Sequence, residues 1–233
     1  MNKRIQLQHA TLRAEINLQG AELLFLGNER SGNILWSKQT DHWNRVAPNL
    51  FPIVGRLVND SFTAQGKTYR LTQHGFARDR EFEVVAQNET EVQFRLISDA
   101  ESMDIYPYHF VFEVRYSLTE NGITVSYETF NTGNEPMYYS VGGHPAFYLK
   151  DPLENYYLEF DSAIQLEREE LQGSYFSGET SYYGVSDHLQ LGDELFENDA
   201  FVLKQPDCKS VSLKHRDGET IVTMSCDSWT AIG

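Results

Sequence analysis

The sequence predicts an all-β protein made of antiparallel strands. Apolar and polar residues alternate with a period close to two in most segments that can be interpreted, and short turn-forming stretches separate these segments. No long stretch holds a period of 3.6 residues with caps at both ends. Short strands joined by tight turns, without intervening helices, are typical of an antiparallel sandwich or barrel rather than a parallel α/β sheet.

The individual strands follow from this alternation. Residues 12–18 alternate as a half-buried strand requires. Three pairs of segments are predicted to form hairpins around short polar turns: 81–85 with 91–97, 110–118 with 123–130, and 210–213 with 220–224. Residues 167–171 and 193–196 are the two predicted helical turns, and neither is long enough to form a stable helix alone.

The composition predicts one folded domain over residues 1–233. Hydrophobic residues make up 40% of the chain, and 13 Tyr and 14 Phe supply enough apolar surface to bury a core. All-β domains often reach this length as one unit, and no repeat, low-complexity tract or Pro/Gly-rich linker divides the sequence. We therefore expect a single domain.

The charge balance and the N-terminal sequence restrict the partners. The 34 acidic residues outnumber the 19 basic ones, and the net charge of -15 argues against nucleic acid as a partner. Neither a continuous apolar signal segment nor an 18-residue apolar run occurs, so we expect no membrane association and a cytoplasmic protein. Cys208 and Cys226 lack metal-ligand spacing and are expected to be reduced structural thiols.

Three polar clusters are the candidates for chemistry, because the usual dinucleotide, nucleotide, zincin and α/β-hydrolase motifs are absent. Arg56 follows an apolar run with two prolines and a glycine; it is either a surface residue at a strand end or a guanidinium that grips hydroxyl or phosphate oxygens. His74 and Arg78 flank Gly75-Phe76-Ala77, where a hydrogen-bonded structural histidine is the alternative to a functional one. Gly-Gly-His144-Pro continues a strand poorly, which favours a bend with an exposed imidazole.

The motifs themselves resemble the aldose 1-epimerase family, and most closely its LacX-type branch. The matching segments are Phe51-Pro52-Ile53-Val54-Gly55-Arg56-Leu57, His74-Gly75-Phe76-Ala77-Arg78 and Gly142-Gly143-His144-Pro145-Ala146-Phe147. Their order and spacing agree with the family, and alternating strands continue between them. The resemblance therefore covers nearly the whole chain.

The resemblance implies an antiparallel β-supersandwich of the galactose-mutarotase type with a sugar cleft on one concave face. It implies that Arg56 orients the substrate, that His74 contacts or assists it, and that His144 is the general acid. Asp199 resembles the family's sugar-binding aspartate, although a solvated turn residue is the alternative. We expect no cofactor and no metal.

The sequence departs from the family pattern at its end. Family members continue to a Glu-Pro-Trp-like segment whose glutamate is the catalytic base, whereas this chain stops at Gly233 without one. The sequence therefore represents either a truncated form, lacking the C-terminal end of the family fold, or a protein without the usual base. We expect weak or absent epimerase activity in the 233-residue form.

Three functions remain open from the sequence. The first is interconversion of the α and β anomers of a free aldohexose by acid/base ring opening. The second is the same chemistry on a hexose 6-phosphate, for which Arg56 and Arg78 would bind the phosphate. The third is a non-catalytic sugar-binding or sensing module. The expected partner is a monosaccharide or sugar phosphate, and the expected assembly is a monomer or homodimer.

Overall fold

The computed structural model describes residues 3–37 and 43–233. The chain forms two compact units, Met1–Tyr148 and Leu149–Gly233, each with its own hydrophobic core. The strands named below all pair antiparallel, which confirms the predicted all-β class. That both units form one domain over residues 1–233 stays a prediction.

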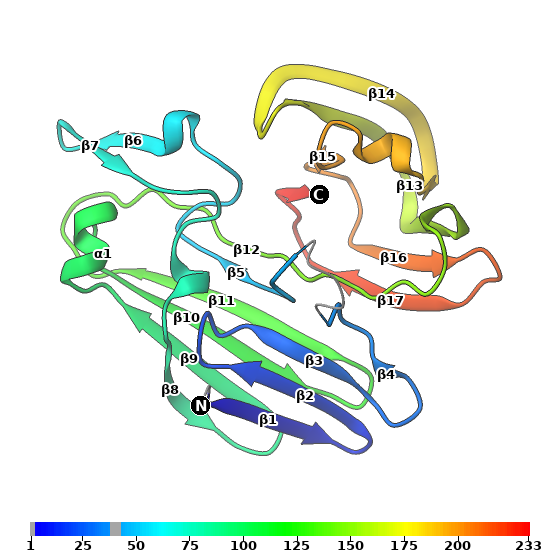
Figure 1. The fold of residues 1–233 in the computed structure, drawn as a ribbon, viewed down its shortest axis with the longest axis horizontal. Helices are drawn as coiled ribbons and strands as arrows, with labels where there is room; N and C mark the ends of the chain where they lie inside the picture. The colour runs from blue at the N-terminus through cyan, green and yellow to red at the C-terminus, as the bar shows by residue number, and fades with distance from the viewer. Residues whose placement is uncertain (1–2, 38–42) are drawn as a thin grey trace. The chain divides into compact units, whose positions relative to one another are not determined.

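The first unit contains two four-stranded sheets, drawn in blue and in green in Figure 1. One sheet consists of consecutive strands, β1 (Arg4–His9), β2 (Leu12–Asn17), β3 (Leu23–Asn28) and β4 (Gly32–Asn33). The other has the order β11-β10-β9-β8, with β8 (Glu83–Gln87), β9 (Glu91–Ile97), β10 (Phe110–Leu118) and β11 (Ile123–Asn131). Two of the predicted hairpins, β8 with β9 and β10 with β11, are thereby confirmed.

The core of the first unit lies between these sheets. Ala14 and Ile16 of β2 are fully buried, as are Phe112 and Val114 of β10, and all four belong to one apolar cluster. Every second residue of β10 from Phe110 to Leu118 is buried, as expected for a central strand with one face on the core. Burial of this apolar surface is the main source of stability for the unit.

Short elements connect the sheets and position the candidate site. They are β5 (Asn49–Leu50), β12 (Gly142–Gly143), the hairpin β6 (Ser61–Ala64) with β7 (Lys67–Arg70), and the 3-10 turns η1 (Val58–Asp60) and η2 (Ala77–Asp79). The short helix α1 (Ala100–Ile105) begins with a capping box, in which Asp99 and Ser102 satisfy each other's backbone N–H groups. This helix was not predicted, because six residues are too few to display a helical period.

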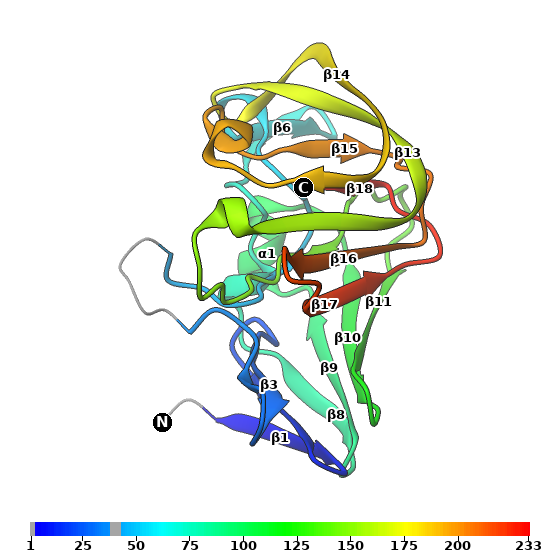
Figure 2. The same cartoon turned by 90° about the vertical axis from the view of Figure 1, so that its right-hand side faces the viewer.

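The second unit is organised around a long curved hairpin, visible as β13 and β14 in Figure 2. Its elements are η3 (Leu153–Asn155), β13 (Tyr156–Gln172), β14 (Tyr175–Gln190), η4 (Asp193–Phe196), β15 (Val202–Lys204), β16 (Ser210–His215), β17 (Thr220–Ser225) and β18 (Ala231–Ile232). The third predicted hairpin is confirmed as β16 with β17. Three register shifts interrupt the pairing of β13 with β14, and such bulges bend a strand.

One of the two predicted helical turns is wrong. Residues 193–196 form the turn η4, but residues 167–171 lie inside β13. The physical reason is that Ile164, Leu166 and Arg168 are all buried at alternate positions, which is a strand period. Gln165 and Glu167, which lie between them, are exposed as outward-facing strand residues.

Two further observations concern the expected environment of the chain. Cys208 and Cys226 are free thiols, as expected. No helix within residues 3–37 and 43–233 has the length and apolar character needed to cross a membrane.

Candidate functional site

Residues 48–55 form the backbone of the candidate site. This segment pairs with the His144 motif on one side and with the His74 motif on the other. On one side β5 pairs with β12, so that Asn49 lies opposite Gly143. The backbone N–H of His144 then donates to the carbonyl oxygen of Pro48 at 3.1 Å. His144 is therefore held at the end of this two-stranded ladder.

The motif of His74 is attached to the other side of the same segment. Phe51 forms a parallel bridge with Gly75, and the N–H groups of Phe76 and Ala77 both donate to the carbonyl oxygen of Phe51 at 3.1 Å. Gly75 has a φ of 69°, and a Cβ atom there would lie 2.3 Å from that same oxygen. This close approach explains why the position holds glycine.

These connections bring the two predicted catalytic histidines together. The imidazole centroids of His74 and His144 lie 5.5 Å apart, and the ring planes are nearly perpendicular at 79°. Two segments 70 positions apart in the sequence thus supply neighbouring imidazoles. His144 remains exposed to solvent, as its Gly-Gly-His-Pro context predicts.

His74 is fixed in one tautomer by Gly55. The Nδ1 atom of the His74 ring accepts a hydrogen bond from the Gly55 N–H at 3.0 Å. The backbone N–H of His74 donates to the Gly55 carbonyl oxygen at 2.8 Å. Because Nδ1 is an acceptor, the neutral ring carries its proton on Nε2. Burial, followed by repulsion from Arg78, lowers the pKa of His74 to about 4. His74 is therefore a neutral hydrogen-bond donor at pH 7.

His144 contacts an indole on its other side. The centroids of the Trp43 and His144 rings lie 5.1 Å apart, with the planes tilted by 39°. Desolvation by the surrounding protein lowers the pKa of His144, and the positive charge of Arg78 lowers it further. Both histidines thus favour the neutral form.

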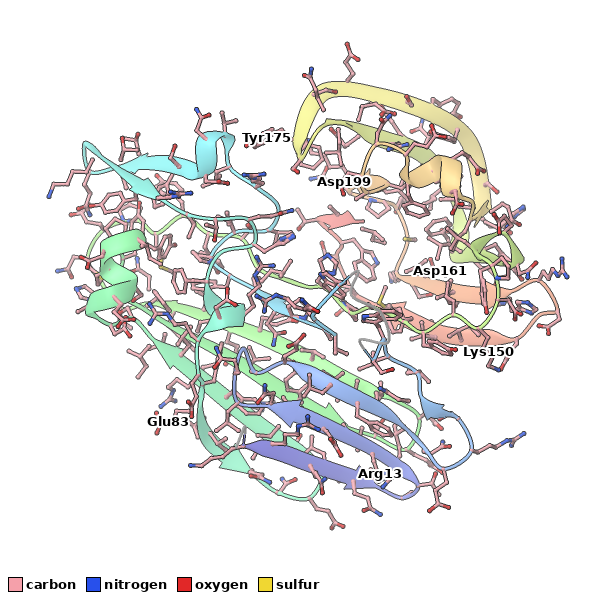
Figure 3. All side chains as sticks on the ribbon, in the orientation of Figure 1. Arg13, Glu83, Lys150, Asp161, Tyr175 and Asp199 are labelled. Atoms are coloured by element: carbon pink, nitrogen blue, oxygen red, sulfur yellow. The ribbon has the colours of Figure 1, made fainter. Side chains whose placement is uncertain are left out.

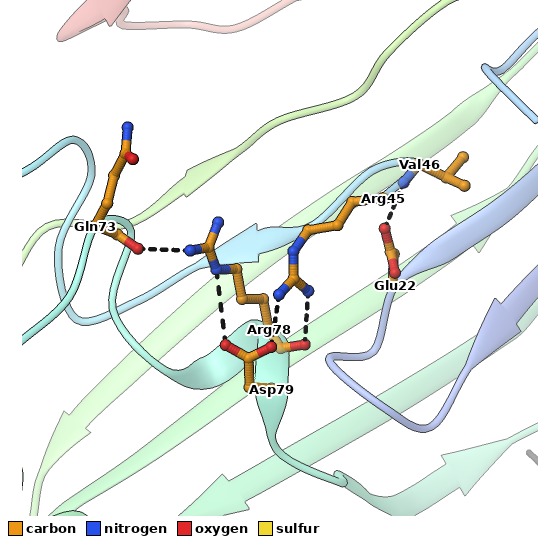
Figure 4. A network of polar contacts seen from close by, with 6 residues as sticks. All are labelled: Glu22, Arg45, Val46, Gln73, Arg78 and Asp79. Atoms are coloured by element: carbon orange, nitrogen blue, oxygen red, sulfur yellow. Dashed lines mark hydrogen bonds and ion pairs between the residues drawn. The ribbon is translucent and has the colours of Figure 1, made fainter. Parts of the chain in front are cut away.

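Arg78 is close enough to both imidazoles for its charge to lower their pKa values. Figure 4 draws the polar contacts of Arg78 itself. One guanidinium nitrogen donates to the carbonyl oxygen of Gln73 at 2.7 Å. Arg45 donates to the carbonyl oxygen of Arg78 at 3.3 Å and to the Asp79 carboxylate at 2.6 Å. The Asp79 carboxylate also lies 3.8 Å from Nε of Arg78. A single carboxylate thus neutralises part of a two-arginine cluster.

Arg56, predicted to orient the substrate, is engaged by a neighbouring carboxylate. Its Nε and one terminal nitrogen donate to the two oxygens of Asp60 at 2.7 and 3.0 Å. This bidentate hydrogen bond lowers the pKa of Asp60. Arg56 directly follows Gly55, the hydrogen-bond partner of His74.

Asp199, the remaining predicted residue, belongs to the second unit (Figure 3). It lies between η4 and β15, is exposed, and has a φ of 76°. Aspartate tolerates this left-handed conformation better than most residues do. The structure therefore brings together His74, His144 and Arg78 in the first unit, and describes Asp199 within the second.

Three polar or aromatic residues near the histidines were not predicted from the sequence. Trp43 contacts His144, Arg45 holds the Arg78 segment, and buried Asn49 donates to the carbonyl oxygens of Gly20 and Ala21. All three precede the first matching motif within the segment Trp43-Asn44-Arg45-Val46-Ala47-Pro48-Asn49. An aromatic and an arginine just before a proline-rich segment were the available signal.

The two cavities described in the structure lie elsewhere. One of about 210 Å³ lies at the turn between β8 and β9, and one of about 350 Å³ is lined by residues of the second unit, including Asp161, Asp227 and Trp229. Among the residues that the structure describes, no group of three or more His, Cys, Asp or Glu side chains is arranged to hold a metal ion. The chemistry considered below therefore rests on the histidine pair.

Comparisons with known proteins agree in sequence and in structure. Residues 3–231 match the sequence model described as aldose 1-epimerase. The chromosomal LacX protein of Lactococcus lactis subsp. lactis is 30% identical over 229 residues, covering 91% of this chain and 76% of LacX. The plasmid-encoded LacX protein of the same organism gives the same identity and coverage.

Two solved structures are similar over most of the chain. The galactose mutarotase related enzyme from Lactobacillus acidophilus is 30% identical with a TM-score of 0.87, covering 93% of this chain and 75% of that one. A galactose mutarotase-like protein from Lactobacillus casei ATCC 334 is 27% identical with a TM-score of 0.86, covering 93% and 77%. The fold is therefore of the galactose-mutarotase type, and the chain belongs to the aldose 1-epimerase family.

Proposed function

We propose that the chain is an aldose 1-epimerase that interconverts the α and β anomers of a free aldohexose. The observation that carries this proposal is the pair of imidazoles, His74 and His144, with ring centroids 5.5 Å apart in a member of this family. The two histidines come from separate motifs and are held by the same backbone segment, residues 48–55. Such a constellation is suited to acid/base chemistry on a small ligand.

The reaction opens and recloses a cyclic hemiacetal. A base takes the proton of the anomeric hydroxyl while an acid protonates the ring oxygen as the bond from C1 to that oxygen breaks. A positioned acid or base typically contributes about 10²- to 10⁴-fold to such a rate. We assign the acid role to the protonated form of His144, because the His144 ring is exposed whereas Nδ1 of His74 is occupied by the Gly55 N–H.

His74 acts as a hydrogen-bond donor in this proposal. Its Nδ1 is occupied by the Gly55 N–H, so its Nε2–H is the group left to meet a sugar oxygen. A neutral imidazole at pH 7 holds a hydroxyl or ring oxygen without transferring its proton. In this proposal His74 binds the sugar and His144 transfers the proton.

We assign no base among the described residues around the imidazoles. In the described part of the first unit, no hydrogen bond or ion pair joins a carboxylate to His74 or His144. The first carboxylates to replace in a search for the base are Asp199 and Asp227, both in the second unit. This observation supports a second candidate function, a sugar-binding module without turnover.

The arginines favour a free sugar over a hexose 6-phosphate. Arg56 is engaged by Asp60, and Arg45 is engaged by Asp79. A phosphate is bound best by guanidinium groups that no carboxylate neutralises. Arg78 is the residue that decides between the two, and a preference for 6-phosphates that disappears in Arg78→Ala would establish the phosphate alternative.

The activity is tested by exchange spectroscopy on an equilibrated aldohexose, which measures the interconversion of α and β anomeric protons directly. Because no base is assigned, we expect the 233-residue protein to accelerate exchange weakly at most. His144→Asn should lower any measurable kcat by at least about 10²-fold with little change in KM, since an amide cannot donate a proton productively. His74→Asn should have a milder effect. Near-normal kcat in His144→Asn at an unchanged melting temperature would exclude His144 as the acid.

If the protein shows no epimerase activity, the second candidate function, a sugar-binding module without turnover, is still possible to test. If the protein binds an aldohexose saturably and does not accelerate exchange, it is a binding or sensing module. The cytoplasm is the compartment we propose, supported by the two free thiols, and a monomer or homodimer remains the proposed assembly.

A further inference from the structure

Trp43 is a large aromatic residue outside the hydrophobic core. Within the described residues, the apolar cluster of the first unit and the partly buried side chains packed against it do not include Trp43. The side chain is nevertheless only partly exposed, because its ring lies against the imidazole of His144. A tryptophan that contacts a site histidine without packing into the core has its remaining surface available for a ligand.

The position of Trp43 is tied to the His144 segment by the backbone. Its carbonyl oxygen accepts a hydrogen bond from Nε1 of Trp36 at 3.2 Å, and the N–H of Trp36 donates to the carbonyl oxygen of Ala146 at 2.8 Å. The N–H of Ala146 in turn donates to the carbonyl oxygen of Val46 at 2.9 Å. Residues on both sides of Trp43 are therefore attached to the residue two positions after His144.

A buried carboxylate holds the same segment from below. Glu22 is 7% exposed and accepts hydrogen bonds from the N–H groups of Val46 and Ala47 at 2.6 and 3.1 Å. Figure 4 shows the Glu22 contact beside the Arg45 and Arg78 network. The indole is thus presented on a fixed backbone, as a preorganised binding surface requires.

The three rings offer complementary chemistry. The indole lies 5.1 Å from His144 at a tilt of 39°, and His144 lies 5.5 Å from His74 at 79°. A pyranose has an apolar face of C–H groups and a polar edge of hydroxyl and ring oxygens. An aromatic plane next to two imidazoles presents one surface for the face and donors for the edge.

We propose that Trp43 is the stacking wall of the sugar site, receiving the apolar face of a pyranose whose polar edge meets His144 and His74. The inference rests on the proposed function and adds the residue that contacts the apolar face of the substrate ring. The stacking contact requires a ring, so it should discriminate against open-chain polyols with the same hydroxyl groups.

The test uses the indole as its own reporter. Comparison of Trp229→Phe with Trp43→Phe/Trp229→Phe isolates the signal of Trp43 and keeps Trp36, whose indole holds the Trp43 carbonyl oxygen. Titration with D-glucose and D-galactose should change the fluorescence of Trp43 saturably, while the linear hexitol sorbitol at equal concentration should not. Trp43→Ala, measured by calorimetry, should weaken sugar binding about 10-fold, and Trp43→Phe should weaken it about 2-fold.

Each outcome decides a specific point. A saturable change for the cyclic sugars, with weaker binding in Trp43→Ala, supports the stacking role. Normal sugar affinity in a folded Trp43→Ala, or an indole signal that ignores bound sugar, overturns the inference while the proposed function stands. Lack of sugar binding by the unmodified protein in calorimetry overturns the proposed function, and the inference with it.

Discussion

His74 combines a strained backbone with a single occupied ring nitrogen. Its φ of 66° is unusual for a residue other than glycine, and the paired hydrogen bonds with Gly55 hold it there. Protonation of Nδ1 would place an N–H donor against the Gly55 N–H donor, so the neutral ring is favoured. This effect lowers the pKa of His74 in the same direction as burial and nearby positive charge do. The protein itself therefore fixes the Nε2-protonated tautomer of His74, before any ligand binds.

The lowered pKa of His74 predicts how stability depends on pH. The unfolded chain binds a proton near pH 6.5 and the folded His74 only at about 4, so stability is lost as pH falls through this window. With allowance for partial exposure, we expect a loss of about 1–2 kcal/mol from this residue. Urea unfolding at pH 7 and pH 4.5 measures it.

The matched variant is His74→Asn. Asparagine tolerates a positive φ, and its Oδ1 can accept from the Gly55 N–H in place of Nδ1. The variant should fold with a weaker dependence of stability on pH between 6.5 and 4. An unchanged dependence would show that other groups cause it.

Arg78 should control the protonation of both histidines. Its positive charge lowers the pKa of His74 and of His144, so Arg78→Gln should raise both, whereas Arg78→Lys keeps the charge. In kcat/KM profiles, loss of the protonated acid with rising pH should then occur at higher pH in Arg78→Gln. Titration of the imidazoles by NMR checks this, and equal values in the two variants would remove Arg78 as the cause.

Sequence patterns indicated part of the candidate site and missed the rest of it for definable reasons. His74, Arg78 and His144 stand in distinctive motifs with glycine, and the structure places them together. Arg56 stands in a motif too, but its carboxylate partner four positions later could not be recognised in an irregular segment. Trp43 has no motif of its own, and its contact with His144 spans about a hundred positions.

The His74 motif can pack against Phe51 only because Gly75 has no Cβ atom. Gly75→Ala would place that atom 2.3 Å from the carbonyl oxygen of Phe51 at a φ of 69°. Gly66, in the turn between β6 and β7, has a φ of 75°, and a Cβ atom added there would have no atom within 4 Å, so Gly66→Ala adds strain without a clash. We expect losses of about 3 kcal/mol or more for Gly75→Ala and about 1 kcal/mol for Gly66→Ala in chemical denaturation.

The comparison between the two glycines isolates the contact. Gly75→Ala should also separate the His74 motif from residues 48–55, and sugar binding should weaken together with stability. Equal stability losses in both variants would mean that the φ value alone matters and that the Phe51 contact is unimportant.

Strands were predictable where one face meets a core and the other meets water. The hairpins of β8 with β9, β10 with β11 and β16 with β17 follow directly from alternation and turn residues. Residues 167–171 of β13 were misassigned because their outward glutamates look helical and the buried Arg168 breaks the apolar pattern. The ladder of β5 with β12 has two residues a side, too few to show a period.

At the scale of the whole molecule, the net charge of -15 should oppose the compact state. Sodium chloride screens this repulsion and also weakens the surface ion pairs, but exposed pairs typically contribute only about 0–1 kcal/mol each. We expect the first effect to dominate, with Tm rising by about 2–4 °C between 20 and 300 mM sodium chloride. A falling Tm would show that the ion pairs matter more.

The fold class was predictable from the sequence because it depends on a period repeated along the whole chain. Division into two compact units was not, since the boundary near Tyr148 carries no linker composition. Each unit has a separate apolar cluster, and assignment of residues to clusters depends on contacts between distant strands. Alternation within one strand does not specify those contacts.

The central claim is that His74 and His144 form one monosaccharide site, and long-range proton–nitrogen NMR of the seven histidines tests it most directly. At pH 7 we expect His74 as the neutral tautomer protonated on Nε2. Addition of D-glucose or D-galactose should shift His74 and His144 together with one Kd, while His9, His109, His188 and His215 stay unchanged. Saturating sugar that leaves both imidazoles unmoved, or shifts only one of them, would contradict the account.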